Sequence, residues 1–105
     1  MANNIFQMAK QAMEMRSQVK KIQKELELLT VEYANSGVKI IARCDMSVAS
    51  IMIDPEVVDI TRMDKLERTI MENVNKALKL AKDKSAEHMK VMTKDMGLDK
   101  LLGGE

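Results

Sequence analysis

The first third of the chain has its apolar residues on one side of a long helix. Starting at Ile5, these residues follow one another at alternating spacings of three and four, and they are Ile5, Met8, Ala12, Met15, Val19, Ile22, Leu26 and Leu29. This heptad pattern, with Gln, Lys, Arg and Glu at most other positions, is typical of a helix that packs against another helix. At 1.5 Å per residue the predicted helix is roughly 40 Å long. Since 105 residues cannot wrap a globular core around such a rod, its apolar stripe requires a second long helix or a second subunit.

After Leu29 the apolar pattern changes to a period of two. Residues 30–34 (TVEYA) are rich in β-branched and aromatic side chains, and Asn-Ser-Gly follows as a turn. Apolar and polar residues then alternate over residues 38–45, and residues 47–54 form a third strand-like segment that ends at Pro55. Three short strands with tight connections predict an antiparallel meander that leaves one face to be covered.

A second long helix is predicted after the strands. One helical turn is expected at residues 55–58, and Thr61 is the expected N-cap, with Asp64 in the first turn. Apolar or small residues then recur every 3, 4 and 4 positions, a period typical of a nearly straight helix, at Met63, Leu66, Ile70, Val74, Ala77, Ala81, Ser85, His88, Met92 and Met96. Small side chains at its centre allow another helix to approach closely, and Gly97 is the expected C-cap. The predicted fold is therefore α+β, a single domain of residues 1–97 (long helix, three-stranded antiparallel meander, long helix) followed by a mobile tail of residues 98–105.

Composition excludes several classes of function. No apolar run is long enough to span a membrane, and the N-terminus lacks the features of a signal peptide. The single Cys44 cannot form an intrachain disulfide, which agrees with a cytoplasmic protein. Cys44 and His88 have no partners at the spacing of a metal site or a catalytic pair, and no Gly-rich phosphate loop is present. We expect no enzymatic activity, no cofactor or metal, and no small-molecule substrate.

Charge is unevenly distributed along a nearly neutral chain. The formal net charge is +1, but residues 62–96 hold nine bases and six acids, whereas residues 30–61 hold two bases and five acids. The predicted helices are therefore basic and the predicted sheet is acidic. Among the electrostatic features, this asymmetry alone indicates a polyanionic partner.

The order of elements and three short stretches resemble the YbaB/EbfC-type nucleoid-associated proteins of bacteria. The matching stretches are residues 8–15 (MAKQAMEM), residues 36–40 (SGVKI) and residues 51–55 (IMIDP), and the resemblance covers about residues 5–97. The sequence differs at residues 44–47 (CDMS), where the family usually has a glycine near the turn. The resemblance implies a tweezer-like homodimer joined through the sheets, with Ile40, Ile51 and Ile53 as expected interface residues. It also implies a nucleoid protein that binds double-stranded DNA with limited sequence preference and bends or compacts it.

The basic residues have two interpretations. Judged alone, the lysines of the second helix are the solvated face of an amphipathic helix. If the two helices run antiparallel, however, the bases of both gather at the tip away from the sheet, and the predicted phosphate contacts are Lys10, Arg16, Lys82, Lys84, Lys90 and Lys94. The near absence of aromatic residues favours duplex over single-stranded DNA. The alternative function is a coiled-coil adaptor or holdase-type chaperone that clamps protein clients between its Met-rich helices.

Overall fold

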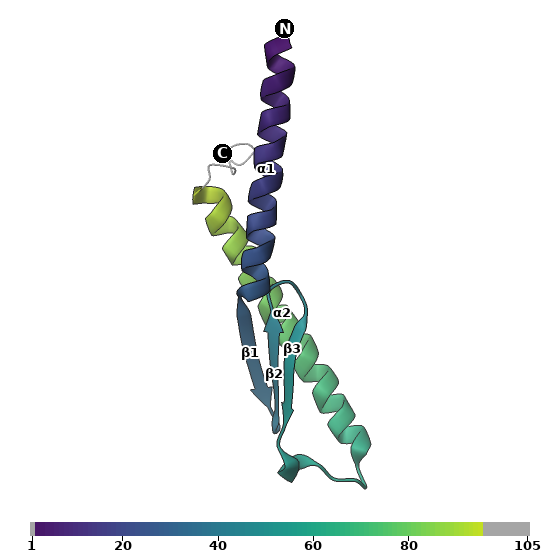
Figure 1. The fold of residues 1–105 in the computed structure, drawn as a ribbon. Coiled ribbons are helices and arrows are strands. Elements are labelled where there is room, and N and C mark those ends of the chain that lie inside the picture. Colours follow the sequence, from purple (N-terminus) through teal and green to yellow (C-terminus); the bar gives the residue numbers. More distant parts are fainter. Residues whose placement is uncertain (1, 96–105) are drawn as a thin grey trace.

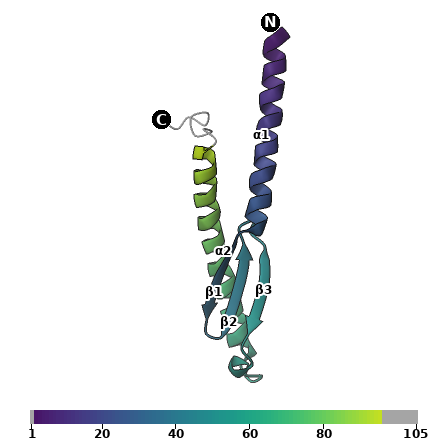
Figure 2. The same ribbon diagram turned by 60° about the vertical axis from the view of Figure 1, so that its left-hand side comes forward.

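The computed structural model describes residues 2–95 and shows a long, narrow molecule (Figures 1 and 2). Its principal extents are 74 × 24 × 18 Å, and its radius of gyration is 20.3 Å. A compact chain of this length has a radius of gyration of about 13 Å. The predicted α+β order of helix, three strands and helix is confirmed. No helix within residues 2–95 has an apolar stretch long enough to cross a membrane.

The first helix leads directly into the predicted meander. Helix α1 spans Ala2–Leu28, and strands β1 (Thr30–Asn35), β2 (Val38–Arg43) and β3 (Val48–Ile53) form an antiparallel sheet in sequence order. The register pairs Thr30 with Arg43 and Val38 with Ile53. Because the Cys44 amide donates to the Leu29 carbonyl at 2.8 Å, the end of α1 is tied to the far end of β2.

The turn between β2 and β3 is built without a glycine. Met46 takes the left-handed conformation, with φ at 74°, and its amide donates to the Arg43 carbonyl at 3.0 Å. One Asp45 carboxylate oxygen accepts from the Ser47 amide at 2.9 Å and from the Ser47 hydroxyl at 2.5 Å. These hydrogen bonds, the hydroxyl first, lower the pKa of Asp45. The Asp45 side chain therefore organises a turn whose backbone conformation would suit glycine.

The second helix begins two residues later than its predicted cap. After a 3₁₀ turn at Pro55–Val57, helix α2 spans Met63–Asp95. The predicted N-cap at Thr61 is wrong, because the Thr61 amide and hydroxyl both donate to one Asp59 carboxylate oxygen, at 3.0 and 2.6 Å. The expected C-cap at Gly97 and the tail of residues 98–105 lie outside the described residues.

The core lies between α2 and the first two strands. It consists of buried side chains from alternate positions of β2 and from one face of α2, which are Val38, Ile40, Ala42, Leu66, Ala77 and Ala81. The predicted apolar face of α2 is thus confirmed from Leu66 to Ala81, whereas Met63 at its start is 41% exposed and Met96 lies outside the described residues. The small residues at its centre, however, allow close approach to β2 and not to another helix, because Ala77 and Ala81 pack in the cluster formed with that strand. Strand β3 lies beyond this cover, and its apolar side chains Val48, Ile51, Met52 and Ile53 are exposed.

Asn73 is a buried polar residue on the apolar face of α2. Its side chain is 1% exposed, and its amide nitrogen donates to the carbonyls of Asn35 at 2.8 Å and Val38 at 2.9 Å. These carbonyls lie on either side of the Ser36–Gly37 turn. Asn73 therefore ties α2 to the connection between β1 and β2.

Candidate nucleic-acid interface

The two helices project from the same end of the sheet and run antiparallel (Figures 1 and 2). They meet close to the sheet, where His88 Nε2 and Glu25 Oε2 are 2.9 Å apart. Beside this pair, Leu29, Lys84 and Val91 line a shallow hollow of about 300 Å³. Contact between the helices is otherwise sparse, so each presents much of its surface to solvent.

Helix α1 extends farther from the sheet than α2 does. Measured from the Glu25–His88 pair at 1.5 Å per residue, Lys94 lies about 9 Å along α2, whereas Arg16 lies about 14 Å and Lys10 about 23 Å along α1. Arg16 and Lys94 therefore differ in height by only about 5 Å, and Lys10 lies beyond the last described residue of α2. The structure separates Lys10 from the bases of α2.

The bases of α2 are spread along the helix. Lys82, Lys84, Lys90 and Lys94 are all exposed. Lys84 Nζ donates to the Thr30 carbonyl at 3.1 Å, which places Lys84 beside the start of β1. Lys82 is still nearer the sheet end along the helix. The expectation that Lys82 and Lys84 lie at the tip is therefore wrong, because the helices meet at His88 and these two lysines precede that point.

Three further lysines of α1 were not among the predicted phosphate contacts. Lys20, Lys21 and Lys24 are exposed and lie about 2–8 Å from Glu25 along the axis of α1, on the side away from the sheet. They are therefore level with Lys90 and Lys94 on α2. Each is visible in the sequence as a base off the heptad stripe, but its height relative to α2 depends on where the two helices meet.

The heptad stripe of α1 is buried only near the sheet. Ile22 is 2% exposed, whereas Val19 is 47% and Ile5 is 72% exposed. The stripe is therefore covered at its lower end, beside the sheet and α2, and open along its upper half.

The residues expected at a dimer interface have different environments. Ile40 is fully buried beneath α2 and belongs to the core of its own chain. Ile51 pairs with Ile40 across the strands but is 46% exposed, and Ile53 is 38% exposed. Of the three, Ile51 and Ile53 have surface available for another molecule.

Cys44 and His88 lie in places that do not resemble a catalytic or metal site. Cys44 is buried, and burial raises the pKa of its thiol, although the nearby Lys84 charge acts in the opposite direction. His88 faces one carboxylate, Glu25. Within the described residues no group of three or more His, Cys, Asp or Glu side chains is arranged to hold a metal ion.

Comparison with known proteins identifies the family. The family model of the YbaB/EbfC DNA-binding family matches residues 1–96, which is nearly the whole chain. The chain belongs to the YbaB/EbfC DNA-binding family. The resemblance drawn from its three short stretches is confirmed, and the YbaB/EbfC family is one of nucleoid-associated DNA-binding proteins and not of enzymes.

Relatives within the YbaB/EbfC family cover most of this chain. A nucleoid-associated protein of Caldanaerobacter subterraneus subsp. tengcongensis is 40% identical over 92 residues, which are 86% of this chain and 83% of that protein. A nucleoid-associated protein of Dictyoglomus turgidum is 38% identical over 97 residues, covering 90% of this chain and 93% of that protein. A nucleoid-associated protein of Akkermansia muciniphila is 28% identical over 102 residues, covering 95% of this chain and 98% of that protein. The match therefore includes both helices and the sheet.

Proposed function

We propose that this protein is a homodimer that binds duplex DNA through the phosphate backbone, with little sequence preference, and changes the conformation or compaction of the duplex in the nucleoid. The YbaB/EbfC family membership supports DNA as the ligand. The relatives named nucleoid-associated proteins support the location.

The observation that carries this proposal is the set of exposed bases on two projecting helices. Arg16, Lys21 and Lys94 are exposed within about 8 Å of one another in height, and none of them takes part in an ion pair within the described residues. Lysine and arginine on an open helix surface can replace the counterions of a phosphate backbone without disturbing the fold. Contacts of this kind position a protein on DNA but do not read base sequence.

A second copy of the chain is supported by the amount of exposed surface. The single chain exposes 8284 Å². A folded monomer of 11.9 kDa exposes about 5,900 Å². The excess, about 2,400 Å², is comparable with the area that a permanent dimer buries. The uncovered apolar side chains of β3, Ile51 and Ile53 among them, are the surface that we assign to this contact.

The experiment is a salt titration of binding to a random-sequence duplex, with and without the changes Lys90→Ala and Lys94→Ala. Each released phosphate contact contributes about 0.9 to the slope of log affinity against log salt, so two side chains in each of two subunits contribute up to about four units. We expect the double variant to bind all duplexes more weakly and to have a flatter salt dependence. Fluorescence anisotropy at several salt concentrations measures both quantities.

The matched control is Arg43→Ala on the sheet. Arg43 donates to the Ser47 hydroxyl at 3.2 Å and lies on the acidic part of the chain, so its loss should leave DNA binding nearly unchanged. If Arg43→Ala abolishes binding while the double lysine variant binds normally, the DNA site is on the sheet. If the wild-type protein does not bind duplex DNA at about 10 μM in low salt, its affinity is weaker than ordinary non-specific DNA binding. The adaptor interpretation then replaces the DNA-binding interpretation.

A further inference from the structure

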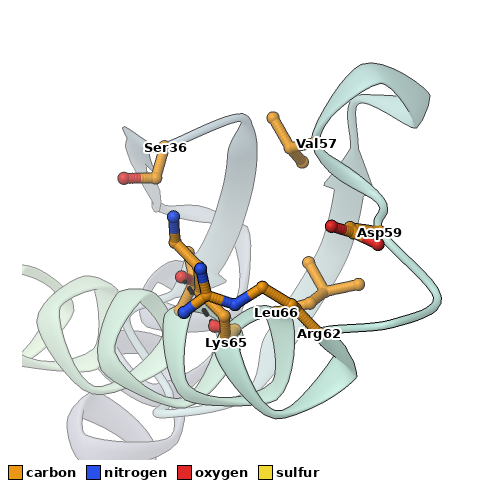
Figure 3. Close-up of a pocket in the computed structure, with 7 residues that line it drawn as sticks. Ser36, Val57, Asp59, Arg62, Lys65 and Leu66 are labelled. Carbon is orange, nitrogen blue, oxygen red and sulfur yellow. Dashed lines mark hydrogen bonds between the residues drawn. The ribbon is translucent and has the colours of Figure 1, made fainter.

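A cavity lies where the β1–β2 turn faces the start of α2 (Figure 3). This part of the fold is at the end of the molecule opposite the projecting helices (Figure 1). The cavity has a volume of about 360 Å³, and its walls include Ser36, Val57, Asp59, Arg62, Lys65 and Leu66. None of these residues belongs to the proposed DNA-binding helix surfaces. The cavity is therefore a second place at which a ligand could be held.

Two basic side chains line this cavity, Arg62 immediately before α2 and Lys65 in its first turn. The Lys65 side chain points towards Ser36, and the Arg62 guanidinium ends beside the Lys65 side chain (Figure 3). Neither takes part in an ion pair within residues 2–95. Two like charges brought together in this way repel each other, and a bound anion offsets that repulsion.

The wall formed by Ser36 is held in place from two sides. Asn73 donates to the carbonyls of Asn35 and Val38, which flank the Ser36–Gly37 turn. On the other side the turn packs closely on Val57, since a Cβ added to Gly37 would lie 2.4 Å from Val57 Cγ1. Ser36 itself has a φ of 55°. The hydroxyl of Ser36 is therefore presented by a backbone that has little freedom to move.

The remaining walls limit what the cavity can accept. Val57 and Leu66 supply apolar surface, and Asp59 lies across the cavity from the Lys65 side chain (Figure 3). One Asp59 oxygen accepts from the Thr61 amide and hydroxyl, and these bonds, the hydroxyl first, lower the pKa of Asp59. Asp59 is therefore ionised at neutral pH, so the side of the cavity that it lines disfavours negative charge. An anion is favoured on the basic side alone.

We propose that this cavity binds a single phosphate group through Arg62, Lys65 and the hydroxyl of Ser36. The planar guanidinium can donate two parallel hydrogen bonds, while the ammonium and the hydroxyl approach from other directions. A tetrahedral phosphate accepts from all of these at once, whereas a planar carboxylate has only two oxygens to share among them. The phosphate belongs to a nucleic-acid backbone or to a free nucleotide, which offer the same chemistry. This site does not depend on the proposed contacts of the projecting helices.

The test follows the amide signals of Ser36 and Gly37 by NMR while the full chain is titrated at low salt with inorganic phosphate, AMP or a short duplex. We expect saturable shifts at these amides. The double change Arg62→Gln and Lys65→Gln should weaken them at least about tenfold, because it removes two charge-assisted contacts. The matched control is Arg68→Gln with Lys79→Gln, which removes the same charge from positions of α2 outside the cavity walls and should leave the shifts unchanged.

The probes also separate the two sources of phosphate. Saturation by duplex at lower concentration than by AMP supports a backbone phosphate, and saturation by AMP or phosphate but not by duplex supports a free ligand. The proposal is overturned if no probe gives saturable shifts at Ser36 and Gly37 up to about 10 mM, because a Kd above that concentration corresponds to less than about 3 kcal/mol of binding free energy. It is also overturned if both double variants lose binding equally. The Lys90→Ala and Lys94→Ala variant should keep this phosphate response, which distinguishes failure here from failure of the proposed DNA contacts.

Discussion

Asn73 should contribute more to the stability of this protein than any other polar side chain of α2. It is 1% exposed, and its two hydrogen bonds join α2 to both sides of the β1–β2 turn. In Asn73→Ala both bonds are lost, and the buried Val38 carbonyl no longer has this partner. We therefore expect the sheet to lose its attachment to α2 at one end of the core.

The magnitude follows from these contacts. Two hydrogen bonds contribute about 1 kcal/mol each, and leaving a buried acceptor without its donor costs about 1 kcal/mol more. The expected loss of unfolding free energy is therefore about 3 kcal/mol. Asn73→Asp keeps the shape but replaces the donor with a carboxylate facing two carbonyl oxygens, so it should cost at least as much at neutral pH.

Urea denaturation followed by circular dichroism measures this loss. All variants should be compared at one protein concentration, because association contributes to the apparent stability. The control is Met71→Ala on the same helix, where a side chain 57% exposed should matter by less than about 0.5 kcal/mol. A loss below about 1 kcal/mol in Asn73→Ala would show that the amide does not tie α2 to the turn, and the reasoning would be refuted.

Three other substitutions test separate parts of the structure. Met46→Gly should raise the unfolding free energy by about 0.5–1 kcal/mol, because φ at this turn is 74°; an equal or lower urea midpoint would contradict this. The unfolding free energy should fall above about pH 8.5, because the Cys44 thiol ionises in the unfolded chain while burial keeps it protonated in the folded chain. Denaturation curves at several pH values should show that Cys44→Ala no longer has this pH dependence. Ile22→Asp changes a side chain that is 2% exposed and should lower the unfolding free energy by several kcal/mol, with a large fall in the thermal midpoint. Val19→Asp changes a side chain that is 47% exposed and should lower the unfolding free energy by under about 1 kcal/mol. Equal midpoints for the last two would mean that another chain covers Val19.

Much of the fold could be predicted because periodicity reports which residues share a face. The period of two over residues 38–45 predicted the buried positions of β2, and the recurring apolar row predicted the buried face of α2. Periodicity does not report what covers a face. For that reason the pattern predicts a helix contact at the small residues Ala77 and Ala81, whereas β2 covers them. Asn73 could not be identified, since a polar residue beside an apolar row gives no sign of the carbonyls that it meets.

The candidate site was harder to predict than the fold. The sequence identified the bases of both helices, but their mutual positions depend on where α1 and α2 meet, and the Glu25–His88 contact sets that point. With this contact, Lys84 lies beside the sheet and Lys10 lies beyond the last described residue of α2. Similarly, the sequence predicted Ile40 and Ile51 as interface residues of the sheet, and the structure pairs them across β2 and β3. The sequence could not show that α2 covers Ile40 and leaves Ile51 exposed.

Because β3 lies outside the cover of α2, the state of this protein should depend on its concentration. An exposed strand with apolar side chains such as Ile51 is unfavourable in water and is a template for unwanted pairing. If a second copy covers it, the fraction of paired chains rises with protein concentration. Occupancy of DNA would then rise more steeply than the amount of protein. A cell that changes production of this chain modestly would obtain a threshold in coverage of its chromosome, and chains made below that threshold would remain vulnerable to aggregation.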